Sequence, residues 1–238
     1  MKSDPIHLWI VDTGALKLDG ELERLLALLP RAEREKTLRF IHREDRLRRA
    51  AGRLMIRALA AREMGYADVP VRLAEFGKPY FAREYAPCFN LSHSGRLVVL
   101  AWGDASVGVD VEKHAPVDWR EISRAFSEAE RALLNASANS LDCFYRLWTI
   151  REAFSKEEGV GLSIFENHAV AIDDERGKIR FGDRELCFRC WKYPEYTVSV
   201  CAERLKDVRV ERLTETDWKC VLAENGYRNG QDEEMNGL

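Results

Sequence analysis

Two long helical patterns, each followed by three strand-like segments, restrict the fold of this 238-residue chain more than any other feature. The first helix is predicted over Glu44–Glu63, where apolar residues recur at helical spacing and arginines fill the other side, and Gly65 supplies a stop signal. The second helix is predicted from about Leu141 to Glu158. Two successive units of this kind indicate an internal structural repeat of about a hundred residues, although residue identity between the units is weak.

Short apolar segments between turn-forming residues predict the strands of both units. They are Val71–Phe76, Cys88–Leu91 and Leu97–Trp102, then His168–Ile172, Glu185–Trp191 and Tyr196–Cys201. We therefore expect an α+β fold of two structurally similar halves, each a long helix with a small, mainly antiparallel sheet, and a ligand site at their interface. The expected halves are residues 1–105 and 106–222, followed by a flexible tail at 223–238.

The composition and the first residues indicate the cellular compartment that we expect for the protein. No apolar run approaches the ~20 residues that a membrane-spanning helix needs, and the first residues lack the pattern of a signal peptide. We therefore expect a cytoplasmic protein with no membrane attachment. The six scattered cysteines are interpreted as reduced thiols, mostly packed inside. Cys187 and Cys190 form a C-x-x-C, but their spacing in a strand sends them to opposite faces, which favours a structural role over metal or redox chemistry.

The net charge of −3 is unevenly distributed along the chain. Residues 31–57 contain ten Lys or Arg and four Asp or Glu, a local net charge of +6, so the remainder carries −9. A basic segment on an acidic protein favours a localised anionic ligand over general binding of nucleic acid. The alternative is a solvated helix face rich in arginine.

The segment Gly108–Glu112 places two carboxylates on one face of a predicted strand. Asp110 and Glu112 alternate with Val109 and Val111, and a period of two separates acids from valines. Like charges this close raise each other's pKa unless a cation lies between them, and oxygen ligands favour a hard ion such as Mg²⁺. The alternative is an exposed edge strand with outward acidic residues.

The second predicted helix adds a third carboxylate and a lysine. It has a buried stripe formed by Leu147, Ile150 and Phe154, and we expect Trp148 in the core as well. Thr149, Glu152 and Lys156 share a different face. Glu152 could then bind the metal ion and Lys156 a phosphate oxygen, whereas the ordinary alternative is a surface ion pair.

A loop histidine and a turn lysine are further candidates for phosphate binding. His93 lies between Ser92 and Ser94 before the turn residue Gly95, and Lys78 lies in a Gly-Lys-Pro turn. Hydroxyl, imidazole and ammonium groups at such turns can hold a phosphate, although each residue has an ordinary structural alternative.

Three segments, Phe89–Gly95, Gly108–Glu112 and Phe144–Gly159, resemble the signatures of the 4′-phosphopantetheinyl transferases. Gly108–Glu112 matches the family's G-[IV]-D-[IV]-E strand, and Trp148–Lys156 matches its W-[ST]-x-[KR]-E-[AS]-x-x-K helix. Other matching positions are Phe40, Glu44, Asp45, Arg48, Gly52 and Gly77 to Pro79. The resemblance extends from about Arg34 to Cys201 and is to the larger, pseudo-dimeric type that activates nonribosomal peptide synthetases.

The resemblance implies transfer of the phosphopantetheine arm of coenzyme A to a serine of an apo peptidyl or acyl carrier protein, with release of adenosine 3′,5′-bisphosphate. It also implies that Asp110, Glu112 and Glu152 hold Mg²⁺ and that Lys156 binds the pyrophosphate. Glu152 is the candidate base, acting directly or through a water molecule. The adenosine end of coenzyme A and its 3′-phosphate would be bound by Lys36, Arg48, Lys78, Ser92 and His93.

The chain departs from the family pattern at four positions. Glu33 replaces a second phosphate-binding lysine and Arg49 a small hydroxyl residue, so the 3′-phosphate contacts are open, with Arg34 or Arg49 able to compensate. Arg151 replaces a lysine before Glu152, and His114 follows Glu112 where a hydroxyl residue can occur.

Two other functions and one structural question stay open at the level of sequence. A non-catalytic relative could bind coenzyme A or carrier proteins without transfer, and a metal-dependent hydrolase could cleave coenzyme A or a nucleotide. Residues 118–134, with Phe126, Leu133 and Leu134, could dock the carrier protein or pack between the halves. The resemblance also implies a monomer with an internal twofold, and whether its carrier serves peptide, polyketide or fatty acid synthesis is not decided.

Overall fold

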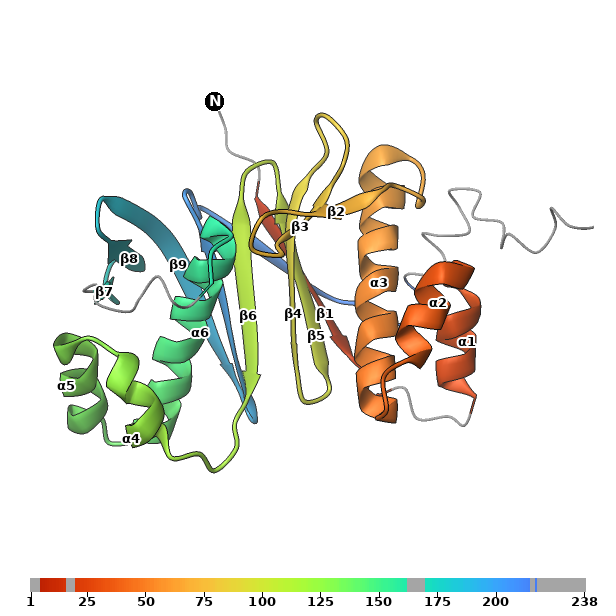
Figure 1. Ribbon diagram of the computed structural model, residues 1–238. Helices are drawn as coiled ribbons and strands as arrows, with labels where there is room; N and C mark the ends of the chain where they lie inside the picture. Colours follow the sequence, from red (N-terminus) through yellow and green to blue (C-terminus); the bar gives the residue numbers. More distant parts are fainter. Residues whose placement is uncertain (1–4, 16–19, 162–169, 215–216, 218–238) are drawn as a thin grey trace, which may run out of the picture.

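The computed structural model describes residues 5–15, 20–161, 170–214 and 217 of the chain. Its helices and sheets lie in four layers, with two sheets side by side in the middle and one long helix on the outside of each (Figure 1). The predicted α+β class is therefore confirmed. In the described residues, no helix is long and apolar enough to cross a membrane.

The first sheet has the strand order β11-β1-β5-β4. Its strands are β11 (Val208–Arg212), β1 (Ile6–Asp12), β5 (Leu97–Gly103) and β4 (Cys88–Ser94). All neighbours are antiparallel except β1 and β11. Residues 208–212 were expected in the second half and no strand was predicted there, but the backbone of β11 pairs with the open edge of β1, so the chain returns to the first sheet near its end.

The helix α3 (Arg43–Met64) covers the outer face of this sheet, close to the predicted range. It packs with two short helices, α1 (Glu21–Ala27) and α2 (Arg31–Leu38). The predicted strand over 71–76 is shorter, because a turn bonded from the Gly77 N–H to the Ala74 oxygen ends it. A small hairpin results, formed by β2 (Val71–Leu73) and β3 (Pro79–Phe81).

The second sheet is antiparallel throughout, with the order β6-β10-β9-β8-β7. Its strands are β6 (Val107–Lys113), β10 (Tyr196–Ala202), β9 (Arg184–Tyr193), β8 (Lys178–Phe181) and β7 (Val170–Asp173). The predicted strand at 168–172 begins outside the described residues, and β8 was not predicted. The outer helix is α6 (Ser140–Glu158), accompanied by α4 (Trp119–Ile122), the 3₁₀ turn η1 (Ser123–Ala125) and α5 (Glu128–Ala136).

Apolar side chains fill the space between the two sheets. Val109 and Val111 point into this core, together with Leu8, Ile10 and Val99 of the first sheet. As predicted, the valines of β6 and its carboxylates occupy opposite faces, which leaves the acids facing α6.

The sheets also meet edge to edge, along a line of contacts between β4 and β6 that we call the seam. In it, the Val109 N–H donates to Asn90 Oδ1 at 3.0 Å, and the Val111 and Lys113 N–H groups donate to the hydroxyls of Ser92 and Ser94 at 3.4 and 3.0 Å. The seam satisfies edge donors of β6 that face away from β10, since buried backbone N–H groups need acceptors.

Two predictions about packing were wrong. Phe126 and Leu134 are buried against Phe144 and Leu147 of α6, so they lie inside the second half and not between the halves, and they are not open to a partner. Leu133 is 47% exposed. The cysteines of the described residues are free thiols, as expected, but they are less buried than predicted, since Cys201 is buried and Cys88 exposed.

Candidate functional site

A carboxylate cluster forms where α6 packs on β6, and a glycine makes this approach close. A Cβ atom on Gly108 would lie only 1.9 Å from the Ala153 oxygen of α6. Glycine therefore lets the helix backbone contact the strand, and this contact brings Glu152 and Lys156 next to Asp110 and Glu112.

The lysine of the cluster pairs with a strand carboxylate. Lys156 Nζ lies 2.6 Å from Asp110 Oδ1 and 3.1 Å from Ser92 Oγ. Ser92 Oγ donates to Asp110 Oδ1 at 2.8 Å, and Ser94 Oγ donates to Glu112 Oε2 at the same distance. The four predicted residues, Asp110, Glu112, Glu152 and Lys156, thus meet at one place, joined by hydroxyls of the seam.

Burial and mutual repulsion disfavour the ionised forms of the glutamates in the cluster. Burial raises the pKa of Glu152 to about 7, and Asp110 and Glu112 add to the shift while Lys156 opposes it. Burial and the Asp110 charge also raise the pKa of Glu112, against hydrogen bonds from Ser94 and the Trp148 indole. Asp110 is 2% exposed, and its Oδ2 has no hydrogen-bond partner among the described residues.

These features suit a divalent cation. In the described part of the chain, no group of three or more His, Cys, Asp or Glu residues already has the arrangement of a metal site, and Lys156 is the cation at Asp110. The donors nevertheless fit Mg²⁺, because they are carboxylate oxygens and one of them, Asp110 Oδ2, is buried without a partner.

A second part of the site is a cavity of about 230 Å³ between α3 and β4. Its lining includes Arg48, Arg49, Arg53 and His93. Desolvation and the Arg48 charge lower the pKa of His93, so its imidazole is neutral near pH 7. The Arg48 guanidinium donates to the Gly95 oxygen and pairs with Asp45, which holds it at the rim. This concentration of guanidinium groups suits a phosphate.

The comparisons with known proteins agree with this arrangement. A family model described as "4′-phosphopantetheinyl transferase, N-terminal" matches residues 18–104, and one for the "4′-phosphopantetheinyl transferase superfamily" matches residues 106–201. A 4′-phosphopantetheinyl transferase of Bacillus subtilis is 37% identical, covering 77% of this chain and 86% of the relative. The chain belongs to the 4′-phosphopantetheinyl transferase superfamily.

Further similarities extend beyond that relative. The 4′-phosphopantetheinyl transferase Sfp of B. subtilis strain 168 is 33% identical over 76% of this chain and 85% of its own length. The L-aminoadipate-semialdehyde dehydrogenase-phosphopantetheinyl transferase of Mus musculus is 32% identical over 69% and 59%. A solved holo-[acyl-carrier-protein] synthase from Neisseria meningitidis matches with a TM-score of 0.32 and 16% identity, covering 42% of this chain and 98% of that one.

Glu33 and Arg49, which both depart from the pattern of this transferase family, offset each other's charge. Glu33 lies 3.5 Å from an Arg49 nitrogen and 3.1 Å from Arg53 Nε, so the acid neutralises arginines that line the cationic cavity. Arg34 instead donates to backbone oxygens of Leu26 and Leu29, which removes it as a substitute phosphate ligand.

Other predicted ligands of the transferase lie in less direct positions. Lys36 is 57% exposed, pairs with Glu33 at 3.6 Å and does not line the cavity between α3 and β4. Lys78 Nζ donates to the Glu157 oxygen at 2.7 Å and to Ser106 Oγ at 2.9 Å, which ties the β2–β3 hairpin to the end of α6. Their roles at coenzyme A stay predictions.

Three functional contacts were missed from the sequence. Trp148, expected in the core, is half-buried and lies close enough to Glu112 to lower the pKa of that carboxyl. Ser94, which was treated only as a neighbour of His93, binds the same carboxylate. Arg151 forms a buried ion pair with Glu130 at 2.7 Å, linking α5 to α6. The alternation of Asn90, Ser92 and Ser94 was a visible signal for the seam.

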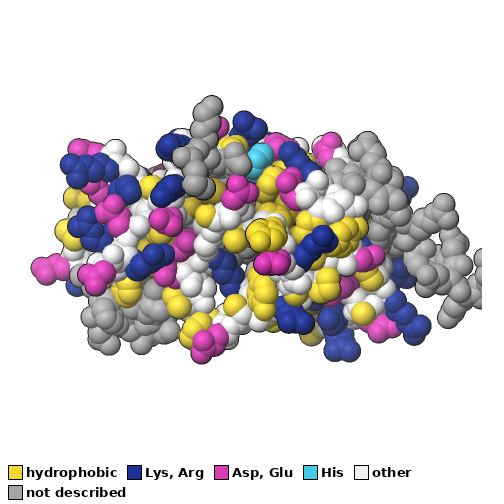
Figure 2. Space-filling view, turned by 90° about the horizontal axis from the view of Figure 1, so that it is seen from above, with side chains coloured by type: hydrophobic (Ala, Val, Ile, Leu, Met, Phe, Trp, Pro, Cys, Tyr) yellow, Lys and Arg dark blue, Asp and Glu magenta, His cyan; other side chains and the backbone are white. Residues whose placement is uncertain are grey.

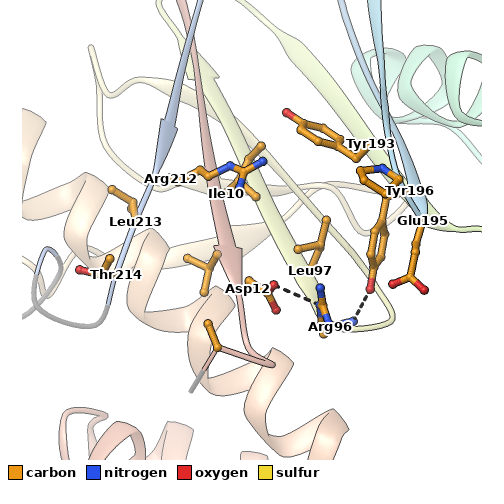
Figure 3. Close-up of a pocket in the computed structure, with 13 residues that line it drawn as sticks. Ile10, Asp12, Arg96, Leu97, Tyr193, Glu195, Tyr196, Arg212, Leu213 and Thr214 are labelled. Carbon is orange, nitrogen blue, oxygen red and sulfur yellow. Dashed lines mark hydrogen bonds and ion pairs between the residues drawn. The ribbon is translucent and has the colours of Figure 1, made fainter. Parts of the chain in front are cut away.

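A larger cavity of about 700 Å³ lies outside this site, where β1, β5 and the β9–β10 turn meet (Figure 3). Its lining combines Ile10 and Leu97 with Tyr193, Tyr196 and the Asp12–Arg96 ion pair. None of the predicted site residues lines it. Size alone therefore does not identify the chemical site of this protein.

The surface seen from above mixes both signs of charge (Figure 2). Lys and Arg side chains alternate there with Asp and Glu, and neither sign forms a continuous field. The expectation that the protein does not bind nucleic acid stays a prediction, and this face gives it no broad basic surface.

Proposed function

We propose that this transferase moves the 4′-phosphopantetheine arm of coenzyme A to a serine of an apo peptidyl or acyl carrier protein. The serine oxygen forms a bond to the β-phosphorus, the bond from that phosphorus to the bridging oxygen breaks, and adenosine 3′,5′-bisphosphate leaves. The observation that supports this assignment most is the carboxylate cluster at Asp110, beside a cavity rich in arginine.

The metal in this proposal is Mg²⁺, held by Asp110, Glu112 and Glu152. When bound, it would neutralise charge on the pyrophosphate and on the leaving oxygen. The raised pKa values of Glu112 and Glu152 and the unpartnered Asp110 Oδ2 support the proposal, because each reflects carboxylate charge without sufficient compensation. Lys156 would turn from Asp110 toward the phosphate oxygens.

Glu152 is the proposed acceptor of the serine proton. Burial raises its pKa to about 7 in the metal-free protein, and bound Mg²⁺ would lower it, so Glu152 would be ionised and able to accept a proton near neutral pH. Lys156, one helical turn away, would hold the phosphates against it. The catalytic assignments are therefore Glu152 and Lys156.

The adenosine end of coenzyme A would lie in the cavity between α3 and β4. His93 and Arg49 would bind the 3′-phosphate there, while Arg48 would orient the rim. Arg49 Nε is buried without a hydrogen-bond partner among the described residues, which supports an anion at this position. The coenzyme would thus extend from the first half of the chain to the metal on the second.

Residues 1–105 and 106–222 are proposed as two halves of an intramolecular pseudo-dimer, with the site at their interface. The four-layer arrangement and the long helix in each half support this view. A cytoplasmic monomer is proposed with it.

Mass spectrometry of intact carrier proteins tests the proposal. Apo peptidyl and apo acyl carrier proteins are each incubated with this protein, coenzyme A and Mg²⁺, and in parallel with EDTA. The expected result is a Mg²⁺-dependent gain of one phosphopantetheine, ~340 Da of added mass. No gain on either carrier, with coenzyme A still bound, would contradict transfer to them and favour a non-catalytic relative.

Matched variants test the residue roles in the same assay. Asp110→Asn and Glu152→Gln are expected to slow transfer by about 10²–10³-fold, since each removes a charged group that acts on the transition state. Glu175→Gln is the control, because Glu175 is an exposed acid on a turn. Full activity of Asp110→Asn would overturn the metal assignment while leaving the transferase activity intact.

A further inference from the structure

The seam between the sheets has a repeat of its own. Asn90, Ser92 and Ser94 each accept a backbone N–H from the residue nineteen positions later, at Val109, Val111 and Lys113. A strand period of two places all three side chains on the same side of β4.

Two of these three side chains, Ser92 and Ser94, form a second hydrogen bond to β6. At Ser92 and Ser94, the residue just before the N–H donor is a carboxylate, Asp110 or Glu112, and the serine hydroxyl donates to it at 2.8 Å. At Asn90 the corresponding residue is Gly108, which has no side chain. Asn90 therefore contributes an acceptor to the seam, whereas Ser92 and Ser94 each contribute an acceptor to the backbone and a donor to a carboxylate.

Ser94 is the clearer of the two serines to interpret. Ser92 is also in contact with Lys156, so its loss would disturb several groups at once. The Ser94 hydroxyl binds two groups of β6, the Lys113 N–H and Glu112 Oε2. Glu112 lies near the end of β6 and is half-buried, and Ser94 is its hydrogen-bond donor from β4. The Ser94 hydrogen bond thus sets the direction of this carboxylate relative to the β6 backbone.

We infer that Ser94 is a positioning residue that aims the Glu112 carboxylate at the divalent metal by holding it to the β6 backbone. The inference rests on the proposed metal site and deepens it. Partners that orient a metal ligand in this way affect metal affinity by about 10–100-fold. Loss of the Ser94 hydroxyl is therefore expected to weaken metal binding by that factor.

The test measures Mn²⁺ binding to the full chain with coenzyme A, by electron paramagnetic resonance of the free ion. Ser94→Thr and Ser94→Val have nearly the same shape and differ in the hydroxyl, which separates the hydrogen bond from the volume of the side chain. The expected result is near-parental affinity for S94T and about 10–100-fold weaker binding for S94V.

Asn90→Ala is the control for a purely structural seam. It removes an acceptor for a β6 N–H but contacts no carboxylate, so it is expected to lower the melting temperature and leave Mn²⁺ affinity unchanged. Equal Mn²⁺ affinities of S94T and S94V would overturn the inference. So would a loss of affinity in N90A as large as that in S94V.

The failure of the proposed metal site would look different. If Asp110→Asn bound Mn²⁺ as well as the parent chain, the metal assignment itself would be wrong, whatever the Ser94 variants did. If D110N lost binding while S94V kept it, the site would stand and only the role of Ser94 would be refuted.

Discussion

The two long helices both approach their sheets through a glycine, but the glycines lie on opposite sides of the contact. On α3 it is Gly52 of the helix, where an added Cβ would meet the methyl groups of Leu91 at 3.2 and 3.3 Å. On β6 it is Gly108 of the strand, where the atom met is the Ala153 backbone oxygen at 1.9 Å. A leucine side chain can rotate away, whereas a helix backbone cannot. The second half is therefore built to a tighter tolerance than the first.

This difference agrees with the chemistry that each half presents. The α3 side provides long arginine side chains around a cavity, which can adjust to an anion. The α6 side provides short carboxylates whose geometry depends on the distance between helix and strand. Rigid backbone contact suits the proposed metal site, which would need fixed ligands, more than it suits the proposed phosphate pocket.

Adding a methyl group at each glycine tests the difference between the two helix–sheet contacts directly. Gly108→Ala forces α6 away from β6 and is expected to lower the free energy of unfolding by at least about 3 kcal/mol. Gly52→Ala removes a glycine from a helix interior, which favours the helix by up to about 1 kcal/mol and offsets the contact with Leu91. Thermal denaturation of both variants is the measurement. Equal losses of stability would show that the two contacts have the same tolerance.

A buried ion pair in the second half and an exposed ion pair in the first half are expected to contribute differently to stability. Arg151→Met leaves Glu130, which is 1% exposed, charged and buried, and is expected to cost about 3–5 kcal/mol. Arg31→Met breaks the exposed pair with Glu35 in the first half and is expected to cost less than about 1 kcal/mol. Urea denaturation at neutral pH measures both. A loss below 1 kcal/mol for Arg151→Met would mean that water or another group replaces the arginine at Glu130.

The carboxylate cluster predicts a pH-dependent difference of intermediate size. The pKa of Glu152 is raised from 4.5 to about 7, so the folded protein holds this proton more tightly than the unfolded chain. Its contribution to the free energy of unfolding therefore falls as pH rises between those two values. Glu152 is partly exposed, so solvent reduces the size of this effect. At pH 8, Glu152→Gln is expected to raise the free energy of unfolding by about 1 kcal/mol and the melting temperature by about 2–4 °C.

Melting curves in EDTA at pH 5 and pH 8 check this expectation. The difference in melting temperature between Glu152→Gln and the parent chain should shrink at pH 5, because Glu152 of the parent chain is largely protonated there. A gain that is equal at both pH values would contradict the raised pKa as its cause. Mg²⁺ with coenzyme A should remove the advantage, because Glu152 would then have a cation.

The smallest expected effect is on coenzyme A affinity, at the cavity between α3 and β4. Glu33→Gln removes the negative charge beside Arg49 and Arg53 and is expected to tighten coenzyme A binding a few-fold, about 0.5–1 kcal/mol. Calorimetry at two salt concentrations measures it, and the gain should shrink at high salt. Glu35→Gln, an exposed acid of the same helix, is the control. Unchanged affinity in Glu33→Gln would place the 3′-phosphate elsewhere.

Much of the cluster could be predicted because its causes are local. Alternation along β6 separated Asp110 and Glu112 from the valines, and helical spacing put Glu152 and Lys156 one turn apart. The partner of Lys156 was not predictable in the same way. The sequence suggested a pair with Glu152, but the ammonium lies at Asp110, because the two elements face each other across Gly108.

Other errors arose from contacts between distant segments. The position of β11 in the first sheet depends on the open edge of β1, about two hundred residues earlier in the chain. Burial of Phe126 depends on α6, and the hydrogen bond from Ser94 depends on where β6 places Glu112. A single sequence contains no local signal for such contacts.

The α+β class, the two long helices, strand candidates in both halves and the residues that carry the family resemblance could all be predicted from the sequence. Those features follow from periodicity and residue chemistry, which act over a few positions. Three contacts became visible only in the folded chain: seam hydroxyls bind the strand carboxylates, Glu33 neutralises the arginines beside it, and Lys78 binds the end of α6. These contacts depend on distances between elements, and packing sets those distances.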